Sequence, residues 1–277
     1  MTPTEAPVGR LLVCPTPIGN LEDITLRTLR ELGDADVIAC EDTRRTRILL
    51  ERYEIQTRLL SLHEHNEAAR ARELVSRIAR GETVALVSDA GMPLISDPGY
   101  ELLRGALRAE LPVEVLPGPS AVLTALVASG LSASSWRFVG FLPRARAERR
   151  SIFAEATETV IAFESPRRLA ATLAELAELD PERPVAVCRE LTKIHEEVSR
   201  GTAADLAGKF AAQEARGEIV LLCGPAEAGG ASREQALETL RELVAAGARA
   251  RPAATALARL TGLKANELYR GLVGTDT

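Results

Sequence analysis

Short runs of apolar residues recur through the first half of the chain, and most of them show no polar alternation. Unbroken aliphatic runs of this kind are typical of strands buried on both faces of a parallel sheet. A segment with apolar residues at helical spacing follows nearly every run. The runs lie at residues 11–13, 37–39, 59–62, 83–87 and 113–116. This alternation of strand and helix predicts a mostly parallel α/β sheet.

Loops with unusual chemistry follow the predicted strands. They contain Pro, Gly, Asp, Asn and Arg, and lie at residues 14–20, 41–44, 63–66, 88–99 and 117–120. In open α/β sheets, ligands bind beyond the carboxyl ends of the strands. Because these ends meet at one edge of a parallel sheet, we expect the loops to gather into one site. We expect that site to be organised around the strand and loop within residues 81–99.

The pattern changes after residue 131. Further apolar runs predict a second, mixed α/β unit with strands at residues 138–142, 159–163, 185–188, 196–199 and 219–223. A Gly/Ala-rich segment at residues 226–231 is typical of a linker, and three short helical patterns follow it. We therefore predict an N-terminal parallel α/β domain at 1–130, a second mixed α/β domain at 131–226 and a C-terminal helical tail at 232–277.

Composition indicates a soluble, globular protein. The chain has 277 residues, of which 46% are hydrophobic and 26% charged, which fits two folded domains better than one. Residues 1–7 lack the features of a signal peptide, and the longest apolar run, at 121–131, is too short to span a membrane. The four cysteines stand singly, without C-x-x-C spacing. We expect them to be buried thiols of a cytoplasmic protein.

The net charge of −5 does not by itself indicate a nucleic-acid partner. The distribution of arginines is more informative, because the guanidinium group suits bidentate recognition of phosphate. Clusters occur at Arg44, Arg45 and Arg47, at Arg144, Arg146, Arg149 and Arg150, at Arg167 and Arg168, and at Arg249 and Arg251. Each cluster is also consistent with an ordinary solvated surface.

Several classes of site are poorly supported. The first predicted strand lacks a G-x-G-x-x-G motif, and the chain lacks a P-loop, which argues against a Rossmann dinucleotide site and an NTPase. His63, Glu64 and His65 alternate along an extended segment, and no further ligand set accompanies them. We therefore expect no metal site.

The loops taken together resemble the tetrapyrrole-methylase superfamily of S-adenosylmethionine (SAM) methyltransferases. The motifs Glu41-Asp42-Thr43-Arg44, His63-Glu64-His65-Asn66, Ser88-Asp89-Ala90-Gly91, Pro117-Gly118-Pro119-Ser120 and Gly140-Phe141-Leu142-Pro143-Arg144 carry the resemblance. Within the superfamily they are similar to the ribosomal RNA small subunit methyltransferase I family. The resemblance implies a two-domain class III methyltransferase fold with a small helical tail, and a homodimer.

The resemblance also implies that SAM is the cofactor and that it binds in a cleft between the two domains. The residues that it implies for this site are Pro17, Asp89, Ala90, Gly91, Leu94, Ser120, Ala121, Phe163 and Leu191. The first seven come from loops after the strands of the first domain, and the last two come from the second domain.

The reaction that the resemblance implies is methylation of the 2′-hydroxyl of a cytidine in the decoding centre of 16S small-subunit ribosomal RNA. A 2′-hydroxyl becomes a good nucleophile when a base removes its proton. His63 is our candidate for that base, Asp42 is its rival, and Arg44 is a candidate for positioning a phosphate or the hydroxyl. Alternatively, His63 and Asp42 cap helices and hold the loops together.

Two other functions remain open at this point. The same fold could methylate a tetrapyrrole-like small molecule, or the chain could be a non-catalytic RNA-binding assembly factor. The arginine clusters and the helical tail favour a large polyanionic substrate, either ribosomal RNA or the assembled small subunit.

Overall fold

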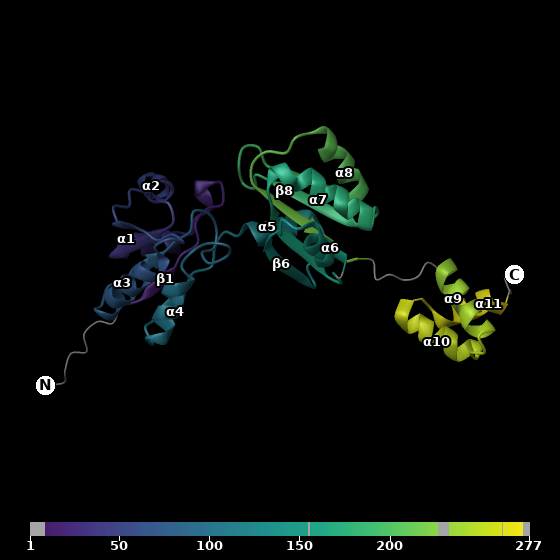
Figure 1. The fold of residues 1–277 in the computed structure, drawn as a ribbon. Helices are drawn as coiled ribbons and strands as arrows, with labels where there is room; N and C mark the ends of the chain where they lie inside the picture. Colours follow the sequence, from purple (N-terminus) through teal and green to yellow (C-terminus); the bar gives the residue numbers. More distant parts are fainter. Residues whose placement is uncertain (1–8, 155, 227–232, 262, 274–277) are drawn as a thin grey trace.

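The computed structural model describes residues 9–154, 156–226, 233–261 and 263–273. The described chain forms two β-sheets with flanking helices, followed by a separate group of three helices (Figure 1). The predicted α/β class with a small helical tail is therefore confirmed. The predicted linker lies largely outside the described residues, as do residues 1–8.

The first sheet consists of five parallel strands in the order β3-β2-β4-β1-β5. Its strands are β1 (Leu11–Val13), β2 (Val37–Cys40), β3 (Leu59–Ser61), β4 (Val84–Leu86) and β5 (Val113–Val115). The segments between them form η1 (Leu21–Asp23), α1 (Leu26–Asp34), α2 (Thr43–Arg52), α3 (Glu67–Ala79) and α4 (Tyr100–Arg108). Each strand lies within or next to a run that the hydrophobic pattern predicts.

Successive residues of the central strands point to opposite faces of this sheet, which explains why the runs show no polar alternation. On β1, Leu11 and Val13 pack with α3 and α4, whereas Leu12 packs with α1 and α2. Both faces are therefore covered, and the central strands β1, β2 and β4 are almost fully buried. Each large aliphatic side chain buried in this way contributes about 1.5–3 kcal/mol of transfer free energy.

The second sheet is mixed, with the order β6-β7-β10-β8-β9. Its strands are β6 (Trp136–Phe141), β7 (Thr159–Glu164), β8 (Pro184–Arg189), β9 (Glu197–Thr202) and β10 (Ile219–Cys223). Only the pair β6–β7 is parallel. Helices α6 (Arg146–Ala154), α7 (Pro166–Leu179) and α8 (Ala203–Ala212) cover one face.

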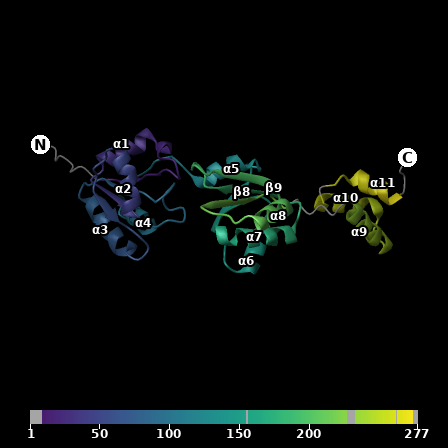
Figure 2. The same ribbon diagram turned by 90° about the horizontal axis from the view of Figure 1, so that it is seen from above.

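Helix α5 (Ala121–Ser129) covers the other face of the second sheet, although it follows the last strand of the first sheet. Its residues Val122, Ala125 and Leu126 pack against Ile161 and Val220. Figures 1 and 2 both place α5 beside the second sheet. The range 1–130 that we predict for the first domain therefore includes a helix that packs on the second sheet, and the three domain ranges stay a prediction.

A second link joins the two halves at the loop after β1. The backbone N–H of Asn20 donates a hydrogen bond of 3.1 Å to Oγ1 of Thr192. Gly19 makes this approach possible, because a Cβ at this position would lie 2.5 Å from Cγ of Lys193 and 2.9 Å from the carbonyl oxygen of Leu191. The loop after β1 is thereby held against the loop after β8.

The tail consists of α9 (Arg233–Ala245), α10 (Ala250–Thr261) and α11 (Ala265–Val273). These helices pack on one another around a small apolar cluster that includes Leu240, Leu257 and Leu268. Figure 2 shows the tail at the opposite end of the second sheet from the first sheet. In the described residues, no helix has the length and apolarity needed to cross a membrane. The four cysteines are free and buried.

Candidate functional site

A cavity of about 480 Å³ opens between the two sheets. From the first half, the loops after β1, β2 and β4 contribute residues to its wall, as does the first residue of α5. From the second half, the wall is completed by residues of β6, β7, β8 and β10, of the segments that follow β7 and β8, and of the segment that precedes β10. Its wall includes Ile18, Glu41, Asp89, Asp97, Ala121, Phe141, Phe163, Glu164, Cys188, Leu191 and Val220. The parallel direction of the first sheet is what brings three of its loops to the same cavity.

The loop after β4 is fixed to the loop after β1. Thr16 and Gly91 form an isolated antiparallel bridge, with N–H···O distances of 2.9 and 3.0 Å. Gly91 has φ of +81°, and a Cβ at this position would lie 3.3 Å from Cγ2 of Ile18. A side chain larger than hydrogen would therefore be strained there. The loop backbone consequently lies close to the cavity wall formed by Ile18.

The same loop contains two non-glycine residues in the left-handed region, Leu94 with φ of 72° and Ser96 with φ of 75°. Such conformations are uncommon and persist where the surrounding structure enforces them. Glu67 at the start of α3 contributes to this, because its Oε1 accepts hydrogen bonds of 2.9 Å from the N–H groups of Gly99 and Glu101. The loop that carries Asp97 is therefore held at both ends.

Three carboxyl groups share the first-domain side of the cavity: Glu41, Asp89 and Asp97. Asp89 has partners, because its Oδ1 accepts a 3.0 Å hydrogen bond from the N–H of Asp42 and its Oδ2 lies 3.6 Å from Nε of Arg45. Burial, together with the negative charges of Glu41 and Asp89, raises the pKa of Asp97 to about 6. Burial and the charge of Asp89 also raise the pKa of Glu41. The cavity therefore holds a carboxyl group that can take up a proton near neutral pH.

The three predicted catalytic residues lie outside the cavity wall. Asp42 caps α2, where its Oδ1 accepts a hydrogen bond of 2.9 Å from the N–H of Arg44. Its carboxylate also pairs with the Arg44 side chain at 2.7 Å, and these hydrogen bonds lower the pKa of Asp42 to about 2. A carboxyl with so low a pKa is a weak base. This arrangement agrees with the alternative in which Asp42 holds the loop together.

His63 follows β3, next to the central strand β2. Its Nε2 lies 3.2 Å from the amide nitrogen of Asn66, whose side-chain oxygen accepts a hydrogen bond from the backbone of His63. Its Nδ1 is buried and has no hydrogen-bond partner among the described residues. The roles of His63, Asp42 and Arg44 in the reaction stay a prediction.

Five of the nine residues predicted to bind the cofactor line the cavity: Asp89, Ala90, Ala121, Phe163 and Leu191. The other four support its wall or lie beside it. Pro17 is buried next to Ile18, Gly91 forms the bridge to Thr16, and Ser120 caps α5. Leu94 packs against the core of the first sheet. That these nine residues bind a cofactor likewise stays a prediction.

Glu41, Asp97, Phe141 and Glu164 also line the cavity, although none of them is among the residues predicted for the site. Glu41 and Phe141 belong to loop motifs that carry the resemblance, and Asp97 lies in the predicted loop at 88–99, so their position after or at the end of strands was an available signal. Glu164 follows the predicted strand at 159–163, so the same signal was available for it, although the structure makes it the last residue of β7.

Comparison with known proteins adds independent information. The model of the tetrapyrrole (corrin/porphyrin) methylases matches residues 10–207. The chain is 46% identical over 268 residues to the ribosomal RNA small subunit methyltransferase I of Mesorhizobium japonicum, covering 95% of this chain and 91% of that protein. A protein of the same name from Micromonospora olivasterospora is 42% identical over 271 residues, covering 96% and 87%.

Solved structures agree on the fold. The methyltransferase CobJ superposes with a TM-score of 0.61 at 20% identity, covering 79% of this chain and 95% of that chain. The uroporphyrin-III C-methyltransferase of Thermus thermophilus, solved with S-adenosyl homocysteine, gives a TM-score of 0.55 at 22% identity, covering 78% and 97%. At such low identity these structures show a shared fold and nothing more.

The raised pKa of Asp97 leads to a prediction about stability. The folded protein binds a proton at this carboxyl more tightly than the unfolded chain, so its contribution to stability is lost as pH rises from 3.8 to about 6. We expect Asp97→Asn to be more stable than the wild type at pH 7, with the difference disappearing below pH 4. Urea denaturation of both proteins across this pH range measures it.

Asp205→Asn is the matched control for Asp97→Asn. Hydrogen bonds from the backbone and hydroxyl of Thr202 lower the pKa of Asp205 in the capping box of α8. The stability difference between variant and wild type therefore has the opposite sign, and Asp205→Asn should be less stable than the wild type at pH 7. Equal stabilities of Asp97→Asn and the wild type at pH 7 would contradict the raised pKa of Asp97.

Proposed function

The chain belongs to the tetrapyrrole methylases and, within them, to the ribosomal RNA small subunit methyltransferase I family, and on this basis we propose that it methylates small-subunit ribosomal RNA with SAM as donor. The finer part of the proposal is that the acceptor is the 2′-hydroxyl of a cytidine in the decoding centre of 16S RNA. The observation that supports it most is a high identity, maintained over nearly the whole chain, to proteins that carry this name. The cavity between the sheets is the proposed site of the reaction.

The cavity has the chemistry that SAM requires. At Gly91 the backbone of the loop after β4 lies close to Ile18 of the cavity wall. The small side chains of Ala90 and Ala121 leave room in the cavity beside this loop. Phe163 and Leu191 provide apolar surface for the adenine on the second-domain side. The carboxylates of Glu41 and Asp89 favour a cation in the cavity. When bound, SAM supplies a methyl group on a positively charged sulfur.

The protein contributes orientation and removal of a proton. Holding the 2′-oxygen in line with the methyl group can lower the barrier by about 7–11 kcal/mol. We propose that a carboxylate oxygen of Asp97 accepts the proton of the 2′-hydroxyl, because Asp97 lines the cavity and its raised pKa makes it a stronger base than an ordinary aspartate. His63 and Asp42 remain candidates for the same role, and Arg44 for positioning.

We also propose that the chain functions as a cytoplasmic homodimer in which a second copy covers α5. This helix is apolar on nearly all sides, yet it covers the second sheet with only one of them. Its outer residues Leu123 and Val127 are 52% and 81% exposed. A helix that is hydrophobic all round is normally buried, so this face calls for a partner. A cytoplasmic location agrees with the proposed ribosomal substrate.

The first prediction tests the cofactor site. Ala121→Trp places a bulky side chain in the cavity wall, so we expect affinity for SAM to fall at least tenfold by calorimetry. Ala204→Trp is the control, because Ala204 is an exposed alanine in the first turn of α8 and does not line the cavity. Circular dichroism checks that both variants fold. Wild-type affinity of Ala121→Trp would refute the placement of SAM in this cavity.

The second prediction concerns the base. In single-turnover methylation at saturating SAM and small ribosomal subunits, Asp97→Asn should slow the chemistry by roughly 10²–10⁴-fold. The wild-type rate should fall as pH drops below about 6, because protonated Asp97 cannot accept a proton. This acid limb should be absent in the variant. His63→Ala, Asp42→Asn and Arg44→Ala are compared in parallel, and a loss confined to His63→Ala would assign the base to His63 instead.

The third prediction concerns the dimer. Val127→Glu puts a charge on the exposed apolar face of α5, and we expect it to convert a dimer into a monomer in analytical ultracentrifugation. Ile48→Glu is the control, because Ile48 is 60% exposed on α2. The assignment of α5 to the interface is wrong if the wild type sediments as a monomer or Val127→Glu as a dimer.

A further inference from the structure

The predicted arginine cluster at residues 144–150 is divided by the structure into buried and exposed members. Arg149 is only 8% exposed, although arginine is rarely buried. Its Nε and one terminal nitrogen donate to the two carboxylate oxygens of Glu175 on α7, at 3.0 and 2.6 Å. Arg149 is therefore engaged inside the protein and has no free face for a phosphate.

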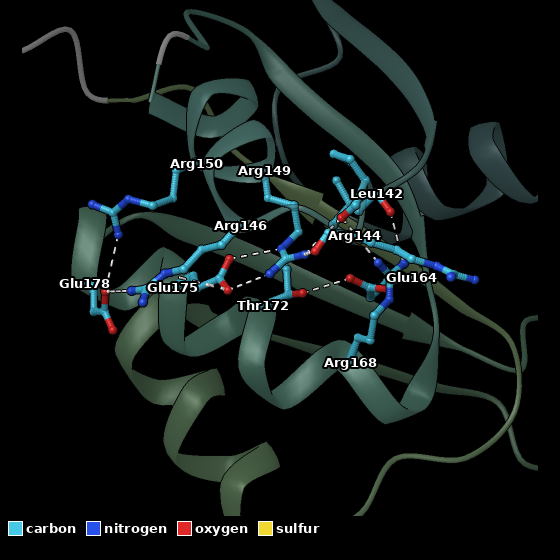
Figure 3. A network of polar contacts seen from close by, with 11 residues as sticks. Leu142, Arg144, Arg146, Arg149, Arg150, Glu164, Arg168, Thr172, Glu175 and Glu178 are labelled. Atoms are coloured by element: carbon cyan, nitrogen blue, oxygen red, sulfur yellow. Dashed lines mark hydrogen bonds and ion pairs between the residues drawn. The ribbon is translucent and has the colours of Figure 1, made fainter.

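The third nitrogen of Arg149 holds the loop between β6 and α6. Its Nη1 donates to the carbonyl oxygens of Pro143 and Arg144 at 2.9 and 2.6 Å. Arg168 on α7 donates to the carbonyl oxygens of Leu142 and Pro143 at 3.0 and 3.2 Å. Two guanidinium groups thus bind three successive carbonyls of one loop (Figure 3).

Arg168 is itself anchored by a buried carboxylate. It forms an ion pair of 2.6 Å with Glu164, which is 2% exposed. Glu164 also accepts hydrogen bonds from the hydroxyl of Thr172 and the N–H of Ser165. Since Glu164 lines the cavity, this network connects the loop directly to the wall of the proposed site.

Arg144 is the member of the cluster that stays available. The neighbouring Arg146 and Arg150 both pair with Glu178. Arg144 is exposed, and in the described parts of the chain no acidic side chain or other acceptor engages its guanidinium. The same loop begins next to Phe141, which is 63% exposed and lines the cavity, with its ring centroid 5.3 Å from that of Phe163.

We propose that Phe141 and Arg144 form the rim over which a single-stranded segment of the RNA substrate enters the cavity, with Arg144 contacting a phosphate and Phe141 a base. An unpaired guanidinium and an exposed aromatic ring three residues apart at the start of one loop are the combination of groups that binds single-stranded nucleic acid. Arg149 and Arg168 are positioning residues, which act by fixing the backbone that carries this pair. The inference rests on the proposed function, because it assumes an RNA substrate.

The experiment measures equilibrium binding of the full-length enzyme to small ribosomal subunits that lack the methyl group, at several KCl concentrations. A phosphate contact with a single strand contributes about 0.7 to the slope of log affinity against log salt concentration. Arg144→Gln should weaken binding and reduce the slope by about this amount. Affinity for SAM should not change.

Arg146→Gln is the matched control, because it removes the same charge two residues away from a side chain that is already paired. It should leave the slope unchanged. Phe141→Ala should weaken binding roughly tenfold at every salt concentration, as expected for a lost stacking contact. Phe141→Trp keeps an aromatic ring and should bind the subunits as tightly as the wild type. A wild-type slope in Arg144→Gln, or equal slopes in the two arginine variants, would overturn the inference.

The positioning role needs a variant that still folds. Replacing both Arg149 and Glu175 by methionine leaves no unpaired buried charge. Replacement of a whole buried ion pair by apolar side chains of similar volume is often neutral for stability. We expect this variant to keep cooperative unfolding and affinity for SAM, but to lose the part of the slope contributed by Arg144. Adding Arg144→Gln should then have little further effect. A wild-type slope in the methionine variant would show that the network only stabilises the fold.

These outcomes separate the inference from the proposed function. If the wild type does not methylate the subunits, the proposed function fails. If the wild type methylates them but Arg144→Gln retains the wild-type slope, only the inference about the rim fails.

Discussion

All strands of the first sheet run in the same direction, and the rest of the site depends on this constraint. The carboxyl ends of β1, β2 and β4 share one edge, so their loops meet without any further requirement. The bridge between Thr16 and Gly91 then joins two of these loops. Because β5 leads out of the same edge into α5, the connection to the second sheet starts at the site. One topological fact thus places the cavity between the two halves.

Charged side chains are used in two ways around the cavity. In the second half, Arg149 and Arg168 are matched with Glu175 and Glu164, and their remaining donors bind backbone carbonyls. Removing one partner of a buried pair such as Arg149–Glu175 typically costs about 3–5 kcal/mol. In the first half, Glu41 and Asp97 share the cavity with Asp89, and their pKa values are raised. These three carboxyl groups therefore favour the binding of a proton or of a cation in the cavity.

These two kinds of charge place different chemistry on opposite walls. The wall from the first sheet is acidic, which suits a positively charged donor and a hydroxyl that must lose its proton. The wall from the second sheet is apolar at Phe163 and Leu191, contains Glu164, whose charge is paired with Arg168, and includes Phe141 at the start of the loop that carries Arg144. A polyanionic strand that approaches from that loop meets a cation at the rim and carboxylates inside. The order of charges therefore favours a substrate whose sugar enters the cavity while its phosphates stay outside.

Local sequence determined the elements, because unbroken aliphatic runs such as Leu11–Val13 can be buried on both faces only as central strands. Glycine and proline after those strands likewise determined where the loops lie, and the loop motifs identified the family. Contacts between distant residues could not be determined in this way. Helix α5 packs on the second sheet because Val122 and Leu126 meet Ile161 and Val220 there, which no local pattern encodes. Arg149 and Arg144 are the same residue type within one cluster, so the local sequence does not distinguish them. Arg149 is buried because it pairs with the carboxylate of Glu175, 26 residues further along the chain, whereas Arg144 is exposed. Burial raises the pKa of Asp97 most, and the charge of Glu41 adds to it because β2 packs beside β4, which only the tertiary structure decides.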